Sequence, residues 1–282
     1  MLKRMTLAAL ALVAGAAAGG AQVLPTGPPE LDHFYCYFIE APVQYIAVQL
    51  QDQFAVARKE TEFIKDLRAV RLCNPVQKTL RGGAKTPIRH PLDHLLFYLL
   101  NPQPIIPREV VVENQFGYQV LYTRNAEVLA VPSGKALPGA NGLPPEPPPI
   151  PQDLDHFKCY SASGQIQTRV VLLKDQFQSV VVEVLEPILF CNPVEKTIPS
   201  TATVAGTVTP IRDPKAHLTC YTVTPRPFQG VAFINNQFVP KGVAPPELTV
   251  LNSDILCLPS YKLRWTEITY PSDKVPGAAG LP

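Results

Sequence analysis

The sequence predicts an all-β protein with two tandem domains, each a pseudo-twofold pair of about three-stranded units that form a small barrel or sandwich. The first observation is that 32 prolines interrupt nearly every window in which a helix could run. The second is that short runs of Val, Ile, Leu, Phe and Tyr lie between these prolines, as expected of strands. The third is a motif that recurs four times along the chain.

The first 21 residues are predicted to be a secretory signal peptide. Lys3 and Arg4 precede an apolar run and then a stretch rich in Ala and Gly, which is the order of such a signal. A transmembrane anchor is the alternative, but it needs about 20 apolar residues and this run is shorter. We therefore expect a mature chain that is secreted, periplasmic or on the cell surface, without membrane insertion, where disulfides are allowed.

The charge balance argues against nucleic acid as a partner. The chain has 25 Lys and Arg and 23 Asp and Glu, and two of the basic residues lie in the predicted signal peptide. The remainder is 23 of each sign, so the mature chain has no net charge. Such a surface has no long-range field to attract nucleic acid or an anionic membrane.

The four-fold repeat has a recurring signature and two alternating subtypes. The heptapeptide "LDHFYCY" at residues 31–37 returns as "LDHFKCY" at residues 154–160, and each half contains a second, more divergent unit. The signature comprises a histidine (His33, His94, His156, His217), a tyrosine four residues later (Tyr37, Tyr98, Tyr160, Tyr221), a Gln-Phe pair (Gln53-Phe54, Gln115-Phe116, Gln176-Phe177, Gln237-Phe238) and a proline followed by a lysine (Pro75/Lys78, Pro132/Lys135, Pro193/Lys196, Pro259/Lys262). Units one and three read "CNPVxK", whereas units two and four read "VPSGK" and "LPSYK".

These repeats predict the domain boundaries. Domain 1 is expected over residues 31–135, with units 31–78 and 92–135, and domain 2 over residues 153–265, with units 154–196 and 216–262. Residues 136–152 form a Pro-rich, semi-rigid linker, and residues 266–282 a Pro/Gly-rich C-terminal tail. In each unit we expect one strand from the histidine past the tyrosine, one ending at Gln-Phe, and one leading into the proline corner.

The six cysteines are predicted to form three disulfides. Unit two lacks both of its cysteines and has Phe97 and Ala130 in their places. Paired loss indicates that the two positions are bonded to each other, since one cysteine alone would be a reactive thiol. The predicted bridges are Cys36–Cys73, Cys159–Cys191 and Cys220–Cys257, each stabilising the fold by roughly 3–4 kcal/mol in the chain-entropy model.

The His-x-x-Cys spacing also raises metal binding and thiol catalysis as alternatives. Unit two keeps His94 without either thiol, and no fourth ligand recurs, which argues against zinc. Three copies of the motif argue against a catalytic Cys–His pair. We expect the signature to be structural, with the histidine bonded to backbone and Tyr, Gln and Phe in one core layer. The alternative is a ring of four histidines that responds to protons or a ligand.

The motif combination resembles a known but uncharacterised family. "DHFKCY", "DQF" or "NQF", and "CNPVxK" or "LCxPSxK" are similar to the motifs of a family of bacterial secreted domains, a domain of unknown function often found in tandem. The resemblance spans residues 31–135 and 153–262 and implies a bacterial location outside the cytoplasm. The resemblance does not imply any enzymatic activity. Unit two departs from the pattern by lacking both cysteines, which affects only its bridge.

No motif for hydrolysis, phosphate binding or calcium binding is present, so we predict no catalytic residue, no metal ligand and no cofactor. The single Trp265 is either a carbohydrate-stacking platform or packs the C-terminal extension onto the domain.

The function we expect is a secreted non-catalytic module for binding, display or structure at the bacterial cell exterior. Its specific partner is unknown, with surface polysaccharide and protein as the candidates. The alternative is an extracellular enzyme of the hydrolase type, acting on polysaccharide, with its site in unit-specific loops such as residues 81–85 or 241–247.

Overall fold

The computed structural model describes most of the chain between residues 30 and 269. The described ranges are 30–41, 47–57, 62–64, 68–101, 106–140, 142, 146, 148–200 and 206–269. The predicted signal peptide, residues 1–21, lies outside them, as do residues 270–282 of the predicted C-terminal tail.

The all-β prediction is confirmed. Sixteen strands belong to one antiparallel sheet, and the described residues contain one short helix, α1 (Gln53–Ala57). The strands are β1 (Phe34–Glu40), β2 (Val48–Asp52), β3 (Glu62–Ile64), β4 (Arg68–Pro75), β5 (Gln77–Leu80), β6 (Lys85–Thr86), β7 (His94–Leu99), β8 (Arg108–Asn114), β9 (Gly117–Ala136), β10 (Phe157–Ser163), β11 (Arg169–Lys174), β12 (Ser179–Ile198), β13 (Thr207–Thr209), β14 (His217–Arg226), β15 (Gly230–Asn235) and β16 (Glu247–Glu267).

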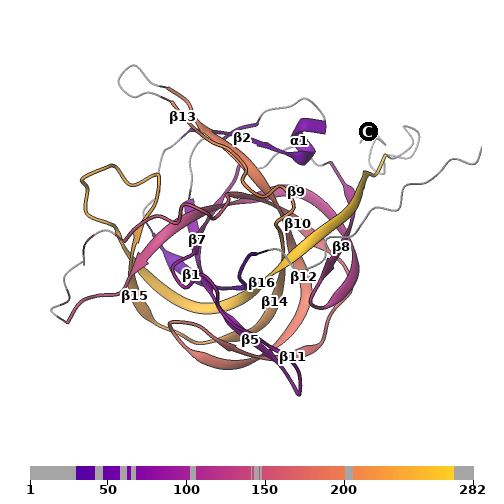
Figure 1. The fold of residues 1–282 in the computed structure, drawn as a ribbon, viewed down its shortest axis with the longest axis horizontal. Helices are drawn as coiled ribbons and strands as arrows, with labels where there is room; N and C mark the ends of the chain where they lie inside the picture. Colours follow the sequence, from indigo (N-terminus) through magenta and orange to yellow (C-terminus); the bar gives the residue numbers. More distant parts are fainter. Residues whose placement is uncertain are drawn as a thin grey trace, which may run out of the picture.

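Eight of these strands form a closed ring in sequence order. The pairings run β1–β4–β7–β9–β10–β12–β14–β16, and β16 pairs with β1 to complete the cycle. Each repeat unit contributes two neighbouring strands, the one that begins near its histidine and the one that runs through its proline corner. Figure 1 shows these strands curving around a common centre. Closure satisfies the backbone groups that an open sheet would leave at its edges.

The expected arrangement of two separate domains is not confirmed. We refer to residues 31–135 and 153–265 as the first and second halves. Strand β9 of the first half pairs with β10 of the second, and β1 pairs with β16, so the ring needs both halves. The physical reason is that each half supplies four ring strands, which alone would have two open edges. Among the described strands, neither half closes into a barrel or sandwich of its own.

The interior of the ring holds the disulfides. One buried cluster contains residues from all eight ring strands, and only the interior of a closed ring lets side chains from every strand meet. The cluster includes the three predicted bridges, which the structure confirms: Cys36–Cys73, Cys159–Cys191 and Cys220–Cys257. At the fourth equivalent position Phe97 lies directly opposite Ala130 on the neighbouring strand. An apolar pair therefore replaces the missing bridge.

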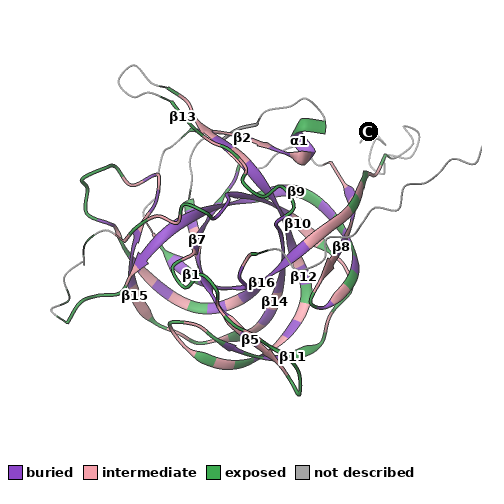
Figure 2. Cartoon of the chain, viewed as in Figure 1, coloured by how far each residue is buried: buried purple, intermediate pink, exposed green. Residues whose placement is uncertain are grey.

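A second, larger core lies between the ring and a set of outer strands. The ring tyrosines Tyr37, Tyr98 and Tyr221 belong to it, together with residues of β2, β8, β11 and β15. Figure 2 shows buried segments following the ring strands and exposed residues concentrated in the outer loops and hairpins. The ring is thus covered on its outside as well as filled inside, which explains why its strands are apolar on both faces.

Outer strands connect units that are two positions apart in the ring. The segment after each proline corner pairs with an outer strand of the opposite unit: β5 with β11, the end of β9 with β15, the end of β12 with β2, and the end of β16 with β8. Every one of these ladders joins the first half to the second. The halves are therefore interlocked by ring pairing and by outer pairing.

Cutting the linker should leave the two halves associated. A protease site inserted after the exposed Gly142 would separate the chain into two pieces, and every disulfide lies within one half. We expect the cleaved protein to elute from size exclusion as a single species of unchanged size, because backbone ladders and both cores hold the pieces together. Elution as two smaller species without denaturant would contradict the interlocked fold.

Candidate functional site

The signature residues meet at four equivalent centres between the ring and the outer strands. Each tyrosine packs against the phenylalanine of the opposite unit, with ring centroids 5.1–5.3 Å apart: Tyr37–Phe177, Tyr98–Phe238, Tyr160–Phe54 and Tyr221–Phe116. Each lysine places its Nζ 4.1–4.8 Å from the ring centroid of the next unit's phenylalanine: Lys78–Phe116, Lys135–Phe177, Lys196–Phe238 and Lys262–Phe54. Three units thus build every centre.

Two of the centres are acidic and contain the aspartate that precedes Gln-Phe. The buried Asp52 carboxylate accepts hydrogen bonds from Tyr160 Oη at 2.9 Å and Asn192 Nδ2 at 2.8 Å. Lys262 Nζ donates to Asn192 Oδ1 at 2.8 Å, which links the amine to the carboxylate through the amide. The carboxylate also accepts from the backbone N–H of Ala55 at 3.0 Å, at the start of α1. Hydrogen bonding of this kind is what a buried charge requires.

The second acidic centre repeats the chain from lysine through asparagine to the carboxylate, here Asp175. Asn74 Nδ2 donates to Asp175 Oδ2 at 2.9 Å, and Lys135 Nζ donates to Asn74 Oδ1 at 2.5 Å. The other carboxylate oxygen accepts from the backbone N–H groups of Phe177 and Gln178, both at 2.9 Å. The carboxylate therefore fixes the turn that carries the Gln-Phe pair.

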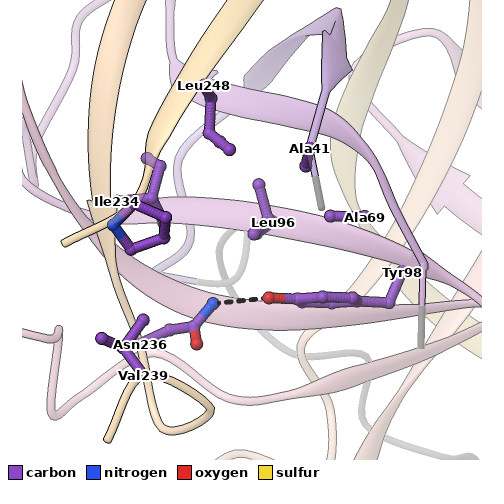
Figure 3. Close-up of a pocket in the computed structure, with 9 residues that line it drawn as sticks. Ala41, Ala69, Leu96, Tyr98, Ile234, Asn236, Val239 and Leu248 are labelled. Carbon is purple, nitrogen blue, oxygen red and sulfur yellow. Dashed lines mark hydrogen bonds between the residues drawn. The ribbon is translucent and has the colours of Figure 1, made fainter. Parts of the chain in front are cut away.

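The other two centres are neutral and use an asparagine with a serine. Asn114 Nδ2 donates to Tyr221 Oη at 2.9 Å and lies 3.2 Å from Ser260 Oγ. In the other neutral centre, Asn236 Nδ2 donates to Tyr98 Oη at 2.9 Å, as Figure 3 shows, and lies 3.3 Å from Ser133 Oγ.

This pairing explains the two subtypes of the repeat. Units that read Asp-Gln-Phe also read "CNP", and units that read Asn-Gln-Phe also read "PS". The residue before Gln-Phe was not among the predicted signature residues. Its alternation in step with the proline corner is the sequence signal that could have identified it.

The four lysines of the centres are held in an environment that disfavours their charge. Burial lowers the pKa of Lys78, Lys135, Lys196 and Lys262 from 10.5 to about 7. Lys196 donates to the side-chain oxygen of Gln237, whereas Lys78 Nζ has no hydrogen-bond partner among the described residues. An amine with such a pKa has the properties of a nucleophile or base, but Lys78 and Lys196 have no exposed surface. A substrate therefore cannot reach them in this conformation.

The four signature histidines are buried near the lysine of their own unit. His33 is 7% exposed and the other three are 2% exposed. Burial, with a smaller contribution from the nearby Lys78, lowers the pKa of His33 to about 3. Burial and the neighbouring lysine lower the pKa of His94, His156 and His217 well below 6.5 as well. All four imidazoles are therefore neutral at neutral pH.

The aspartate before the histidine holds a loop rather than the imidazole. Asp32 accepts hydrogen bonds from the backbone N–H groups of Arg89 and His90, at 2.7–3.1 Å. Asp155 accepts equivalent bonds from Arg212 and Asp213, at 2.8 and 2.9 Å. Hydrogen bonds also join the backbone carbonyls of the two histidines to the proline corners, from Val76 N to His33 O and from Val194 N to His156 O. The Asp-His pair thus anchors a loop and a corner to one strand start.

Metal-binding and membrane-spanning features are absent from the described part of the chain. No group of three or more His, Cys, Asp or Glu residues is placed to hold a metal ion there. The described cysteines of the His-x-x-Cys motifs are all in disulfides. Among the same residues, no helix combines the length and apolar character needed to cross a bilayer. The three disulfides fit a protein that works outside the cytosol.

Two cavities lie near the centres, and they differ in size and openness. One, about 10 Å³ in volume, lies beside Tyr98 and Asn236 and is the size of a single water molecule (Figure 3). The other is an open groove of about 330 Å³ beside α1, lined by Gln53, Val56 and Glu195 among others. Residues 81–85, named above for a possible enzyme site, line neither cavity, and residues 241–247 contribute Pro246 to the small one.

The exposed aromatic residues of the outer sheet were missed by the sequence reasoning. Tyr118 and Tyr122 on β9 are 60% and 48% exposed, and Val120 between them is 42% exposed. Their signal is the alternation in "GYQVLYTR", where both faces of the strand carry apolar side chains. Trp265, in contrast, packs inward with its ring centroid 4.8 Å from that of Phe54.

The hydrogen bond from Tyr160 to Asp52 should contribute measurably to stability. We expect Tyr160→Phe to lower the free energy of unfolding by about 1.5–3 kcal/mol, because a buried carboxylate loses a donor. Urea unfolding measures the change. The matched control is Tyr122→Phe on the exposed face, expected to stay within about 0.5 kcal/mol of the native value. Equal stability of both variants would contradict the role assigned to the acidic centre.

Acidification below pH 6.5 should destabilise the protein through its buried histidines. In the unfolded chain each imidazole titrates near 6.5, whereas in the fold His33 titrates at about 3. The unfolded state therefore binds more protons in this window, and stability falls as pH falls through it. Between pH 7 and pH 5 the expected loss from His33 is about 2 kcal/mol, and His94, His156 and His217 add to the loss in the same direction.

Urea unfolding at several pH values should show a smaller pH dependence in His33→Gln than in the native protein. His90→Gln, which changes an exposed histidine, is the control and should keep the native pH dependence. If the stability of His33→Gln also showed the native pH dependence, the His33 imidazole would have to bind as many protons in the folded state as in the unfolded state. That result would contradict the lowered pKa of His33.

Comparison with known proteins identifies a family without an assigned activity. The model of the family described as a repeat of unknown function (DUF7450) matches residues 103–258. This match spans the outer hairpin of unit two, all of unit three and most of unit four, and covers more than half of the chain. No curated protein and no solved structure matches the chain. The protein therefore belongs to this family of repeats of unknown function.

Proposed function

We propose that this protein is a secreted, non-catalytic module that binds or displays at the exterior of a bacterial cell. The observation that carries the proposal is the burial of the repeated polar residues. Four of these side chains are at most 2% exposed, and each forms a hydrogen bond with a side chain of the opposite unit: Asp52, Asn74, Asn192 and Asn236. The polar residues that recur along the repeat therefore stabilise the fold, and the surface is left for recognition.

Secretion is supported by two independent features. The N-terminal residues 1–21 have the order of a signal peptide, with basic residues, an apolar run and a small-residue region. The three disulfides lie inside the ring, where they need an oxidising compartment to form. A stapled, closed ring suits a protein exposed to proteases and changing conditions outside the cell.

An extracellular hydrolase is the weaker alternative. Such an enzyme needs two carboxylates, or a nucleophile with its base, facing one accessible cleft. The groove beside α1 contains Asp52 and Glu195, but the Asp52 carboxylate is committed to Tyr160, Asn192 and the start of α1. No described feature favours this function over binding.

The test compares binding with turnover. The mature protein is incubated with envelope fractions of its source cells and with a panel of polysaccharides and peptides. We expect saturable binding to the envelope fraction, with no release of reducing ends or amines above the level of a reduced and unfolded control. Turnover by the folded protein, removed by substitution of Glu195, would overturn the proposal. Absence of saturable binding would overturn it too.

A further inference from the structure

One outer sheet presents tyrosines that the fold does not use. Strands β9, β8 and β16 lie side by side, and paired residues on their outward side form rows. We define the tyrosine face as the outward residues Tyr118, Tyr122, Tyr261, Glu109, Glu113 and Arg264. One row runs Tyr118–Glu113–Tyr261, and in another Tyr122 pairs with Glu109. In the first of these rows two aromatic rings flank a charged group on the outward side of the sheet.

Tyr118 and Tyr122 belong to unit two and Tyr261 to unit four, and none of the three is part of the recurring signature. In the equivalent sheet of unit three, the outward positions are Val170, Leu172 and Lys174 on β11 and Ser179, Val181 and Glu183 on β12. That sheet forms the same ladders without any aromatic residue. The architecture therefore does not require rings on this face, and exposed tyrosines that the fold does not need indicate a surface for recognition.

We propose that the tyrosine face binds a neutral polysaccharide. The inference rests on the proposed function, to which it adds the class of ligand and the surface that recognises it.

The spacing of the rings fits an extended ligand. Tyr118 and Tyr122 are four residues apart on one strand, which corresponds to roughly 13 Å. Tyr261 lies two strands away from Tyr118, at roughly 10 Å. The three positions therefore span a surface wider than one sugar ring, on which several units of a polymer could lie. Tyrosine offers an apolar ring for the C–H face of a sugar and a hydroxyl for its polar edge.

The charges on the face argue for a neutral ligand. Arg264 lies 3.5 Å from Glu109 and balances it, while Glu113 forms no ion pair with any described residue. Glu113 stands between Tyr118 and Tyr261, close enough for its charge to raise the pKa of Tyr118. One uncompensated carboxylate repels an anionic polymer and accepts hydrogen bonds from sugar hydroxyls.

The same charges disfavour a protein partner. The centre of a protein interface is depleted of charged residues, because each one must be desolvated there. Here Glu113 lies directly between Tyr118 and Tyr261, and Glu109 lies beside Tyr122. A polysaccharide can leave these groups partly hydrated and bond to them through its own hydroxyls or through bridging water.

Affinity electrophoresis of the folded protein tests the proposal. The gels contain xylan, β-1,3-glucan, galactomannan or starch, with alginate as the anionic comparator. We expect retardation by at least one of the neutral polymers and none by alginate. The double variant Tyr118→Ala/Tyr122→Ala should weaken this binding by at least about tenfold. The matched control, Val170→Ala/Leu172→Ala on the equivalent sheet, should bind as the native protein does.

Two further readouts separate this inference from its alternatives. Glu113→Gln should keep neutral polysaccharide binding within about threefold, because an amide also bonds to hydroxyls. Binding of polylysine that is lost in both Glu113→Gln and Tyr118→Ala would overturn the inference in favour of a basic protein partner. No retardation by any of the four polymers, with envelope binding intact, would overturn this inference and leave the proposed function standing.

Discussion

The pairing of β1 with β16 is the constraint on which the rest of the structure depends. It joins Phe34 to Cys257 across nearly the whole described chain and turns eight strands into a closed ring. Without it, the first and last strands would each present unpaired backbone groups to solvent. Closure also creates a single interior, in which the three disulfides and the Phe97–Ala130 pair are brought together. The two halves of the sequence therefore act as one folded body.

Closure also determines the order of the subtypes. Each centre combines a turn from one unit with a tyrosine and a corner residue from the opposite unit. The Asn192 amide donates from Nδ2 to Asp52 and accepts at Oδ1 from Lys262, whereas the corner serines of the neutral centres lie beside the amides of Asn114 and Asn236. Acidic units must then face acidic units, and neutral units must face neutral ones. Around a ring of four, the order A-B-A-B satisfies this requirement, whereas A-A-B-B would not.

Much of the local structure could be predicted from the sequence, but its assembly could not. Proline frequency and short apolar runs were sufficient for the all-β class, and the joint loss of two cysteines in unit two identified the three bridges. The single ring was missed because a repeat with a Pro-rich linker fits separate domains equally well. Pairing of β9 with β10 depends on the total number of strands and their curvature, which no local pattern encodes.

In the candidate site, too, the residues could be predicted from the sequence but most of their partners could not. The signature histidines and tyrosines were identified, but their partners lie up to 140 residues away, as for Asn192 and Asp52. Sequence spacing within a unit therefore cannot identify the partner. In contrast, Tyr118 and Tyr122 could have been found, since strict alternation places them on one side of a strand whose other side is buried.

The separation of buried and exposed residues finally explains how one repeat can support recognition. The centres couple three units each, so a change at Asp52 or Tyr160 affects residues far along the chain. The outward positions of β8, β9 and β16 pair with one another along the ladders, and unit three forms the same ladders with aliphatic residues in place of Tyr118 and Tyr122. Held on paired strands with both cores behind them, such side chains keep fixed spacings. This reduces the entropy lost when a ligand binds, which flexible loops would lose in full. The rigid outer sheets, rather than the loops, are therefore the surfaces on which this fold can place specificity.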